Sequence, residues 1–164
     1  MRETRRSHVP TARDIMSRNL VTFTPDMEIF HAIRILLKNR ISGGPVVDGQ
    51  GRLLGMLSEL DCLRILSAGE FYSDDHREEG HVGDYMTAEC RTIDPGVDLY
   101  ALAQVFQTHA VRRLPVVSGD ELLGQVSRRD VLKAMEQLGA QRSRTQHYPD
   151  YRAPAEDVGA ARRA

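Results

Sequence analysis

The first half of the chain alternates between a helical and a strand-like spacing of apolar residues. Apolar positions between 29 and 37 recur at the three- and four-residue spacing of a helix. The run PVVDGQGRLLGMLS, which begins at Pro45, predicts two strands joined by a glycine-containing turn. A short extended stretch is predicted before the helix at 20–23. A second helix is predicted after the hairpin at 59–68, ended by Gly69.

The second half of the chain repeats this order of elements. A helical spacing of apolar residues covers 99–106, and the hairpin PVVSGDELLGQVS begins at Pro115 and is one residue shorter. An extended stretch is predicted at 91–93 and a closing helix at 128–138, with Gly139 in the C′ position. Each half therefore predicts a β-α-β-β-α unit.

The start of the first helix in each unit is marked by a proline. Thr24-Pro25 and Asp94-Pro95 place an N-capping residue before a proline, which fits the first turn of a helix. We therefore expect the two crossover helices to begin at these prolines.

The two halves are copies of one sequence. A shift of seventy residues, or sixty-nine after the hairpins, superposes residues at turn and core positions. The matched pairs are Asp14 and Asp84, Met16 and Met86, Thr22 and Thr92, Pro25 and Pro95, Ser58 and Ser127, and Asp61 and Asp130. A single unit of about fifty residues is marginal alone, and two units together can share a core. The predicted fold class is α/β, of the α+β kind, with small mixed sheets and helices packed on them.

Composition excludes several functional classes. The net charge is −1, aromatic residues make up 5% and tryptophan is absent, so we expect no nucleic-acid partner. The first residues lack the apolar region of a signal peptide, and no apolar run approaches membrane-spanning length. We therefore expect a cytoplasmic protein without a membrane partner.

Cysteine and histidine usage does not predict a metal site. Cys62 and Cys90 form no CxxC pair, and Cys62 fits a core position. His76 and His81 stand among acidic residues, but in a segment that resembles a flexible acidic linker. Phosphate-loop and hydrolase motifs are absent, so we expect neither a metal nor catalysis.

The motif Gly-x-x-Ser-x-x-Asp occurs once in each copy, and its chemistry allows two interpretations. Ser and Asp three residues apart before an apolar helix form a capping box, in which each side chain binds the other's backbone N–H. The same groups could hold a sugar-phosphate, since a carboxylate can accept hydrogen bonds from a cis-diol and a helix N-terminus attracts phosphate. The two roles are compatible, and both remain open at this point.

Taken together, these motifs resemble a tandem pair of cystathionine β-synthase (CBS) domains, often called a Bateman module. The resemblance rests on the segments DIM and DYM, ISGGPVVD and VRRLPVVS, and the paired Gly-x-x-Ser-x-x-Asp. It covers Thr11 to Gly139 and implies two repeats about a pseudo-twofold axis, with ligand clefts between them. The expected division is an N-terminal arm at 1–10, repeat one at 11–69, an acidic linker at 70–81, repeat two at 82–139 and a disordered tail at 140–164.

The resemblance also implies roles for individual residues. Asp61 and Asp130 would bind ribose hydroxyls, Ser58 and Ser127 would contact ribose or the first phosphate, and backbone beside the PVV strands would read the adenine edge. Thr22 and Thr92 would line the sugar-phosphate wall. The residues expected at the first site are Thr22, Ser42, Gly43, Pro45, Ser58 and Asp61. Those expected at the second are Thr92, Arg112, Arg113, Pro115, Ser127, Arg128, Arg129 and Asp130.

The two sites differ in charge. Arg112 and Arg113 precede LPVV in repeat two, where repeat one has Ser42-Gly43. Arg128-Arg129 follow Ser127, where repeat one has Glu59-Leu60. Guanidinium groups bind phosphate in bidentate geometry, although each could instead be solvated or paired with linker acids. The second site is therefore expected to prefer phosphates, and the first to be empty, weaker or suited to a less anionic ligand.

These observations predict a regulatory, non-enzymatic, stand-alone module. It would bind AMP, ADP or ATP and change its association with itself, as a homodimer of stacked modules, or with an effector protein. S-adenosylmethionine, NAD and cyclic dinucleotides are alternative ligands, because their pockets use the same residue types. The alternative function is a structural dimerisation module with vestigial clefts.

Overall fold

The computed structural model describes residues 8–67 and 80–145, with side chains for 8–67 and 80–141. Most of the N-terminal arm, most of the acidic linker, Gly69, His76 and the tail beyond Thr145 lie outside the described residues. The elements are α1 (Ala12–Ile15), α2 (Ile29–Asn39), β1 (Gly43–Val47), β2 (Leu53–Ser58), α3 (Glu59–Ser67), α4 (Val82–Tyr85), α5 (Leu99–Thr108), β3 (Arg113–Ser118), β4 (Glu121–Ser127) and α6 (Arg128–Thr145).

Each repeat contains the predicted antiparallel hairpin, β1 with β2 and β3 with β4. The extended stretch before the helix adds one parallel bridge to each hairpin, Phe23 to Val46 and Ile93 to Val116. The mixed α+β architecture expected from the sequence is confirmed. The first predicted strand is reduced to a single bridge.

The predicted starts of the crossover helices are wrong by four residues. α2 begins at Ile29, where the Glu28 carboxylate accepts hydrogen bonds from the backbone N–H groups of residues 30 and 31. α5 begins at Leu99, with Asp98 as its N-cap. The Thr-Pro and Asp-Pro pairs form turns instead. Proline fits position i+1 of a turn as well as the first turn of a helix, and an acidic N-cap was available further along.

α6 continues through Gly139 to Thr145, so the predicted end at residue 138 is also wrong. A helical glycine costs about 1 kcal/mol relative to alanine, which a long helix can tolerate. Residues 140–145, which were assigned to a disordered tail, are therefore helical.

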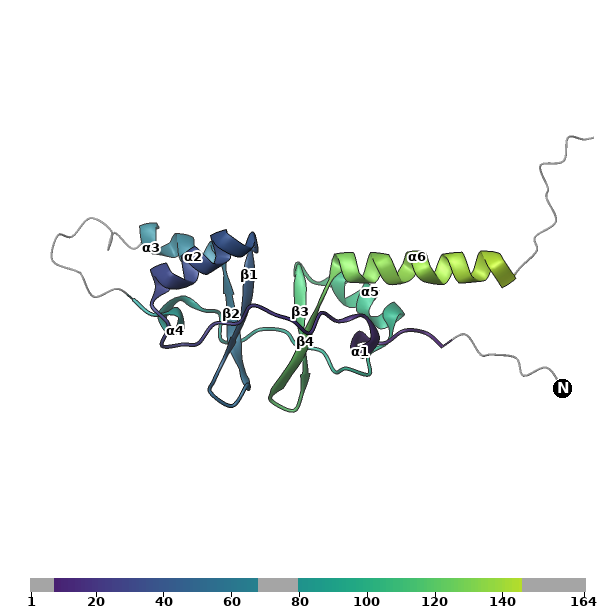
Figure 1. Ribbon diagram of the computed structural model, residues 1–164, viewed down its shortest axis with the longest axis horizontal. Coiled ribbons are helices and arrows are strands. Elements are labelled where there is room, and N and C mark those ends of the chain that lie inside the picture. The colour runs from purple at the N-terminus through teal and green to yellow at the C-terminus, as the bar shows by residue number, and fades with distance from the viewer. Residues whose placement is uncertain (1–7, 68–79, 146–164) are drawn as a thin grey trace, which may run out of the picture.

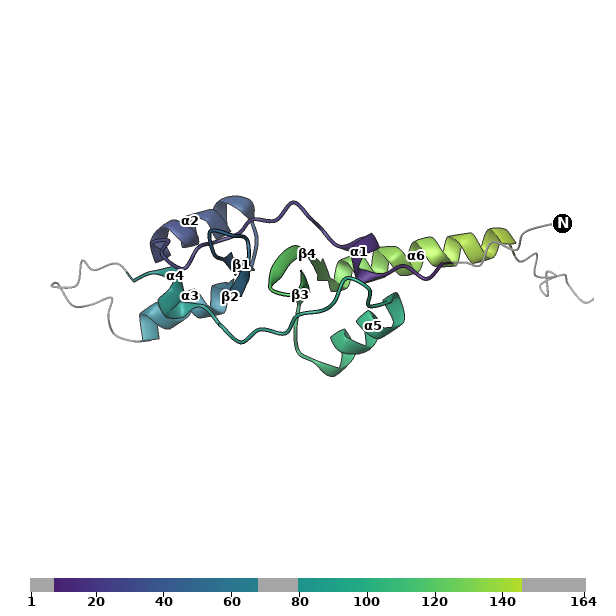
Figure 2. The same ribbon diagram turned by 90° about the horizontal axis from the view of Figure 1, so that it is seen from below.

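The short helices α1 and α4 pack into the opposite repeats. Ala12 and Met16 are buried in the core formed by α5, β3, β4 and α6, whereas Val82 is buried in the repeat-one core. The backbone N–H of Ala12 donates to the Val97 carbonyl at 2.8 Å, and that of Val82 donates to the Met27 carbonyl at 2.9 Å. Both views of the ribbon show α1 beside α5 and α6, and α4 beside α2 and α3 (Figures 1 and 2). Each repeat core is thus completed by a segment from the start of the other repeat.

The hairpins of the two repeats meet in a pseudo-twofold arrangement. Leu53 N–H donates to the Asp120 carbonyl at 2.8 Å, and Leu122 N–H donates to the Gly51 carbonyl at 3.2 Å. Figure 1 shows the hairpins side by side at the centre of the molecule. The sixty-nine-residue offset relates Leu53 to Leu122 and Gly51 to Asp120, so it maps each of these bonds onto the other. The two repeats are therefore related by an approximate twofold rotation.

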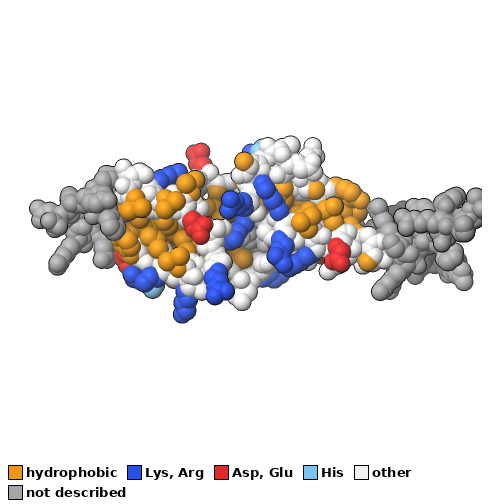
Figure 3. Space-filling view, turned by 90° about the horizontal axis from the view of Figure 1, so that it is seen from above, with side chains coloured by type: hydrophobic (Ala, Val, Ile, Leu, Met, Phe, Trp, Pro, Cys, Tyr) orange, Lys and Arg blue, Asp and Glu red, His pale blue; other side chains and the backbone are white. Residues whose placement is uncertain are grey.

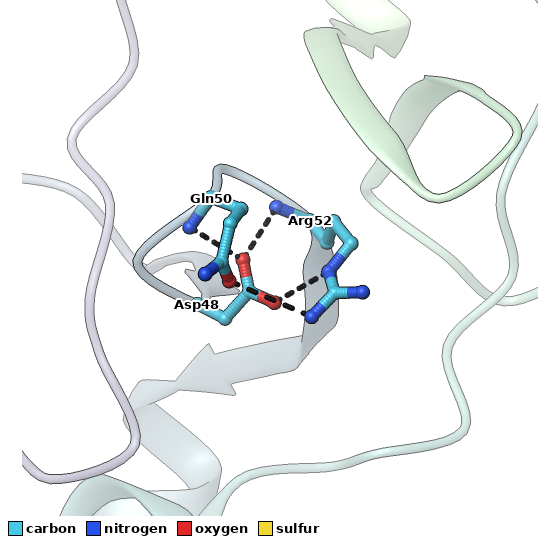
Figure 4. A network of polar contacts seen from close by, with 3 residues as sticks. All are labelled: Asp48, Gln50 and Arg52. Carbon is cyan, nitrogen blue, oxygen red and sulfur yellow. Dashed lines mark hydrogen bonds and ion pairs between the residues drawn. The ribbon is translucent and has the colours of Figure 1, made fainter.

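The tip of the repeat-one hairpin is held by one carboxylate (Figure 4). Asp48 accepts hydrogen bonds from the backbone N–H groups of Gln50 and Arg52, both at 2.9 Å, and from Arg52 Nε at 2.7 Å. The hydrogen bond from the Arg52 backbone, more than the other contacts, holds the pKa of Asp48 below its usual range. This tip carries the residues that touch repeat two.

Candidate functional site

Both Ser-x-x-Asp motifs form capping boxes. Asp61 Oδ2 accepts hydrogen bonds from Ser58 N at 2.8 Å and Ser58 Oγ at 2.6 Å, and Asp61 N–H donates to Ser58 Oγ at 3.2 Å. Ser127 and Asp130 make the same three bonds at 2.8, 2.6 and 3.3 Å. In each aspartate the cap uses Oδ2 and leaves Oδ1 for other partners.

The second oxygen of the aspartate differs between the copies. Asp61 is only 4% exposed, and its Oδ1 lies 3.3 Å from Thr87 Oγ1 and 3.4 Å from an Arg64 nitrogen. Asp130 is half-buried, and within the described residues its Oδ1 has no comparable partner. Asp61 is therefore held more firmly than Asp130.

A cleft of about 710 Å³ lies between the repeats, with Asp61 in its wall. This volume is within the range of small-molecule sites. Repeat one contributes the start of β1, the end of β2 and the start of α3, and the other wall comes from segments of repeat two. The lining includes Ser42, Gly43, Met56, Ser58, Glu59 and Asp61 on one side and Thr87, Glu89, Cys90, Arg91, Val111, Arg112, Arg113 and Pro115 on the other.

Arg113, the first residue of β3, and Arg112 before it line the Asp61 cleft, whereas the sequence grouped them with the Ser127–Asp130 motif. Arg113 is the cross-strand neighbour of Ser127, but its guanidinium donates to the Gly43 carbonyl at 3.0 Å and to Ser42 Oγ at 3.2 Å. Leu114 points into the repeat-two core, so Arg113 must point to the opposite face of its strand. Arg112 and Arg113 therefore belong to the Asp61 cleft.

Other predicted residues are placed as follows. Pro115 lines the Asp61 cleft and Pro45 is buried on β1. Thr22, expected at the first site, does not line this cleft, whereas Thr87 does. Thr92, expected at the second site, directly precedes the Ile93 bridge to β3. Residues Ser127, Arg128, Arg129 and Asp130 lie together around the start of α6.

Thr87 was missed by the sequence reasoning, although a signal for it existed. Met16-Ser17 and Met86-Thr87 correspond under the seventy-residue offset, and both hydroxyl residues bridge to a strand of the other unit. Ser17 pairs with Gln125 of β4, and Thr87 pairs with Met56 of β2. A repeated hydroxyl residue directly after DIM and DYM could have been proposed as a site position.

The cleft has an acidic and a basic side. Glu59 and Asp61 lie at the start of α3, while Arg112 and Arg113 come from the opposite repeat. Cys90 also lines the cleft, and burial raises the pKa of its thiol. The thiol is therefore protonated at neutral pH and forms an uncharged part of the wall. This arrangement can bind a ligand that has hydroxyls at one end and negative charge at the other.

A second, apolar groove of about 440 Å³ lies between α2 and α3. It adjoins the Asp61 cleft, with which it shares Glu59 and Leu63, and half-buried Cys62 lines it. Large apolar side chains are exposed around it and on the matching helices of repeat two. We call these residues the helix face: Leu37, Leu60, Leu63, Leu66, Tyr100, Leu132 and Met135. Figure 3 shows hydrophobic side chains gathered on both halves of the molecule, with Lys and Arg between them.

The described residues contain neither a metal-binding cluster nor a bilayer-spanning helix. No group of three or more His, Cys, Asp or Glu side chains is placed to hold a metal ion. The acidic cluster around His76 and His81 lies outside these residues, except for His81 itself. No helix within 8–67 and 80–145 combines the length and apolar character needed to cross a bilayer.

The sequence and the fold both match known proteins. The CBS domain family model matches residues 12–68 and 82–137, which is more than half of the chain. The CBS domain-containing protein YhcV of Bacillus subtilis is 29% identical over 122 residues, covering 74% of this chain and 82% of that protein. MJ1225 of Methanocaldococcus jannaschii, an uncharacterised protein, is 30% identical over 123 residues, covering 75% of this chain and 42% of that protein. The chain thus spans less than half of the length of this archaeal relative.

A solved structure with a bound nucleotide is among the matches. The crystal structure of CBSX2 in complex with AMP has a TM-score of 0.69 and 29% identity to this chain, and covers 79% of this chain and 98% of that one. CBSX2 is a CBS-pair protein from Arabidopsis thaliana.

Proposed function

Because this chain belongs to the CBS domain family, we propose that it is a regulatory module that binds an adenosine-containing nucleotide of the AMP, ADP or ATP class in the Asp61 cleft. Ligand binding would then change the association of the module with itself or with an effector protein. Such coupling requires that the ligand bind one conformation better than another.

The observation that carries this proposal is the placement of Asp61 opposite Arg112 and Arg113 in one cleft. A carboxylate oxygen accepts more than one hydrogen bond, so Asp61 Oδ1 can accept from ribose hydroxyls beside its Thr87 contact. The two guanidinium groups supply charge and paired donors for phosphate. The AMP-bound state of CBSX2, a related protein, supports an adenosine ligand.

The arginine placement changes the expected ranking of the two sites. The phosphate preference assigned to the second site rested on four arginines, and two of these line the Asp61 cleft. The Asp61 cleft is therefore the stronger nucleotide site in this proposal. The second site, which we call the repeat-two site, consists of Ser127, Arg128, Arg129 and Asp130.

A thermal-shift series tests the nucleotide proposal. AMP, ADP and ATP at one hundred times Kd should each stabilise the fold by about 2.7 kcal/mol, because they bind the native state alone. S-adenosylmethionine, NAD and a cyclic dinucleotide, tested in parallel, distinguish the alternative ligand classes. An unchanged unfolding midpoint with every ligand at millimolar concentration contradicts the proposal and favours the dimerisation module.

A role in dimerisation is favoured by the helix face. Leu63 and Leu132 are 57% and 62% exposed, and they correspond under the repeat offset. Exposed apolar patches of this kind are typical of interfaces, and a face with internal pseudo-symmetry suits a self-complementary contact. We therefore propose that the homodimer forms through the helix face.

The double substitution Leu63→Glu and Leu132→Glu is expected to convert the dimer to a monomer, because it would bury four carboxylates in an apolar contact. Light scattering after size-exclusion chromatography measures the mass. Leu54→Glu on β2 is the matched control, since Leu54 is exposed and lies outside the helix face. Dimers that persist in the double variant, or an equal effect of the control, contradict the proposed interface.

A further inference from the structure

Gln125 of β4 has a buried side-chain oxygen that lacks a partner. The residue is 8% exposed, and its Oε1 has no hydrogen-bond partner within the described residues. Buried polar atoms are almost always paired, and an unpaired one is costly to the fold. Both backbone groups of Gln125 are satisfied by Ser17, with N–H to O distances of 2.9 Å in each direction. The missing partner therefore concerns the side chain alone.

The position of Gln125 directs its side chain away from the repeat-two core. Val126, the next residue, is fully buried in that core, so Gln125 and Ser127 share the opposite face of β4. Met56, the counterpart of Gln125 under the repeat offset, lines the Asp61 cleft together with Ser58. Under the repeat offset the equivalent position in repeat two is Gln125, which shares a face of β4 with Ser127.

We propose that Gln125 selects the base at the repeat-two site, where its Oε1 accepts a hydrogen bond from the exocyclic amino group of an adenine ring. The inference rests on the proposed function and refines it. Two residues along a strand span about 6.6 Å, which is the scale of the separation between a ribose diol and the far edge of its base. A ribose at Ser127 and Asp130 with its phosphate toward Arg128 and Arg129 therefore places the base near Gln125.

The two sites then differ in base recognition. Met56 presents a thioether without a strong acceptor, so the Asp61 cleft holds the base by apolar contact at this position. At the repeat-two site, the amino group of the base would donate to Gln125 Oε1, which has no partner in the empty protein. A site built to bind an N–H group rejects an analogue that lacks it.

The test compares AMP with purine riboside 5′-monophosphate, which lacks the amino group. Calorimetry on the full chain carrying Asp61→Ala reports the repeat-two site alone. There we expect AMP to bind about tenfold tighter than the analogue. Adding Gln125→Met should reduce this preference to below about twofold, mainly by weakening AMP.

A reciprocal variant and a stability measurement separate recognition from a structural role. In the Asp130→Ala background, Met56→Gln should create a preference for AMP at the Asp61 cleft. Without ligand, Gln125→Met should raise the unfolding midpoint by about 2–4 °C, because it removes a buried unpaired oxygen. A residue that only maintained the fold would instead lower the midpoint.

The outcomes separate this inference from the proposed function. An unchanged AMP preference in Gln125→Met, or no AMP binding at all in Asp61→Ala, overturns the inference and leaves the Asp61 cleft as a nucleotide site. No nucleotide binding by the wild-type chain overturns both.

Discussion

Asp61→Ala is expected to weaken nucleotide binding at the Asp61 cleft at least about a hundredfold. The substitution removes a carboxylate proposed to accept two ribose hydroxyls, and each hydrogen bond to a charged acceptor contributes about 1.5–3 kcal/mol. It also removes the acceptor for Ser58 N–H and Oγ, so we expect a loss of about 1–2 kcal/mol in unfolding free energy. Calorimetric titration with AMP and chemical denaturation measure the two effects.

Asp130→Ala is the matched control, because it deletes the same capping bonds from α6. It should cost a similar unfolding free energy and leave binding at the Asp61 cleft intact. Arg113→Ala provides a second comparison. It should weaken AMP more than adenosine, because the guanidinium is proposed to bind phosphate. Loss of high-affinity binding in Asp130→Ala but not in Asp61→Ala would contradict the ranking of the sites.

Gly55→Ala is expected to destabilise the fold by about 2–3 kcal/mol and to weaken nucleotide binding. A Cβ at this position would lie 2.5 Å from the Thr87 carbonyl oxygen and 3.0 Å from Ala88 Cα, both backbone atoms. The bridge from Met56 to Thr87, with N to O distances of 2.9 Å in both directions, would have to open. Because Thr87 lines the Asp61 cleft, the cleft would widen. Urea denaturation measures the stability, and AMP titration measures the binding.

Gly49→Ala is the control in the adjacent hairpin turn. A Cβ there meets no atom within 4 Å, and Gly49 lacks the positive φ of Gly51. We expect a change in unfolding free energy within about 0.5 kcal/mol. Equal destabilisation by the two substitutions would show that loss of glycine flexibility, and not the contact with Thr87, is responsible.

Local patterns in the sequence were sufficient for the elements and for the caps. The hairpins form where PVV and the glycine turns predicted them, since alternation and turn chemistry depend on neighbours in the chain. Ser58 and Asp61 form a capping box for the same reason. The predicted starts of the crossover helices were wrong because a proline after Thr24 or Asp94 fits a turn equally well. The local sequence did not exclude that alternative.

The sequence by itself determined that two copies of one unit share a fold, because the repeat offset and the spacing of apolar residues are properties of the chain alone. Only the tertiary structure decided which segments of the two copies meet. Ala12 and Met16 stand at the start of repeat one yet complete the core of repeat two, and Arg113 of repeat two lies in the cleft of Asp61. The segments that begin the two repeats carry similar residues. Each could therefore pack against its own repeat or against the other repeat without any change in the local sequence pattern. Which packing forms depends on the contact between the two hairpins and on the surface that both repeats bury together. A single copy of the sequence contains neither.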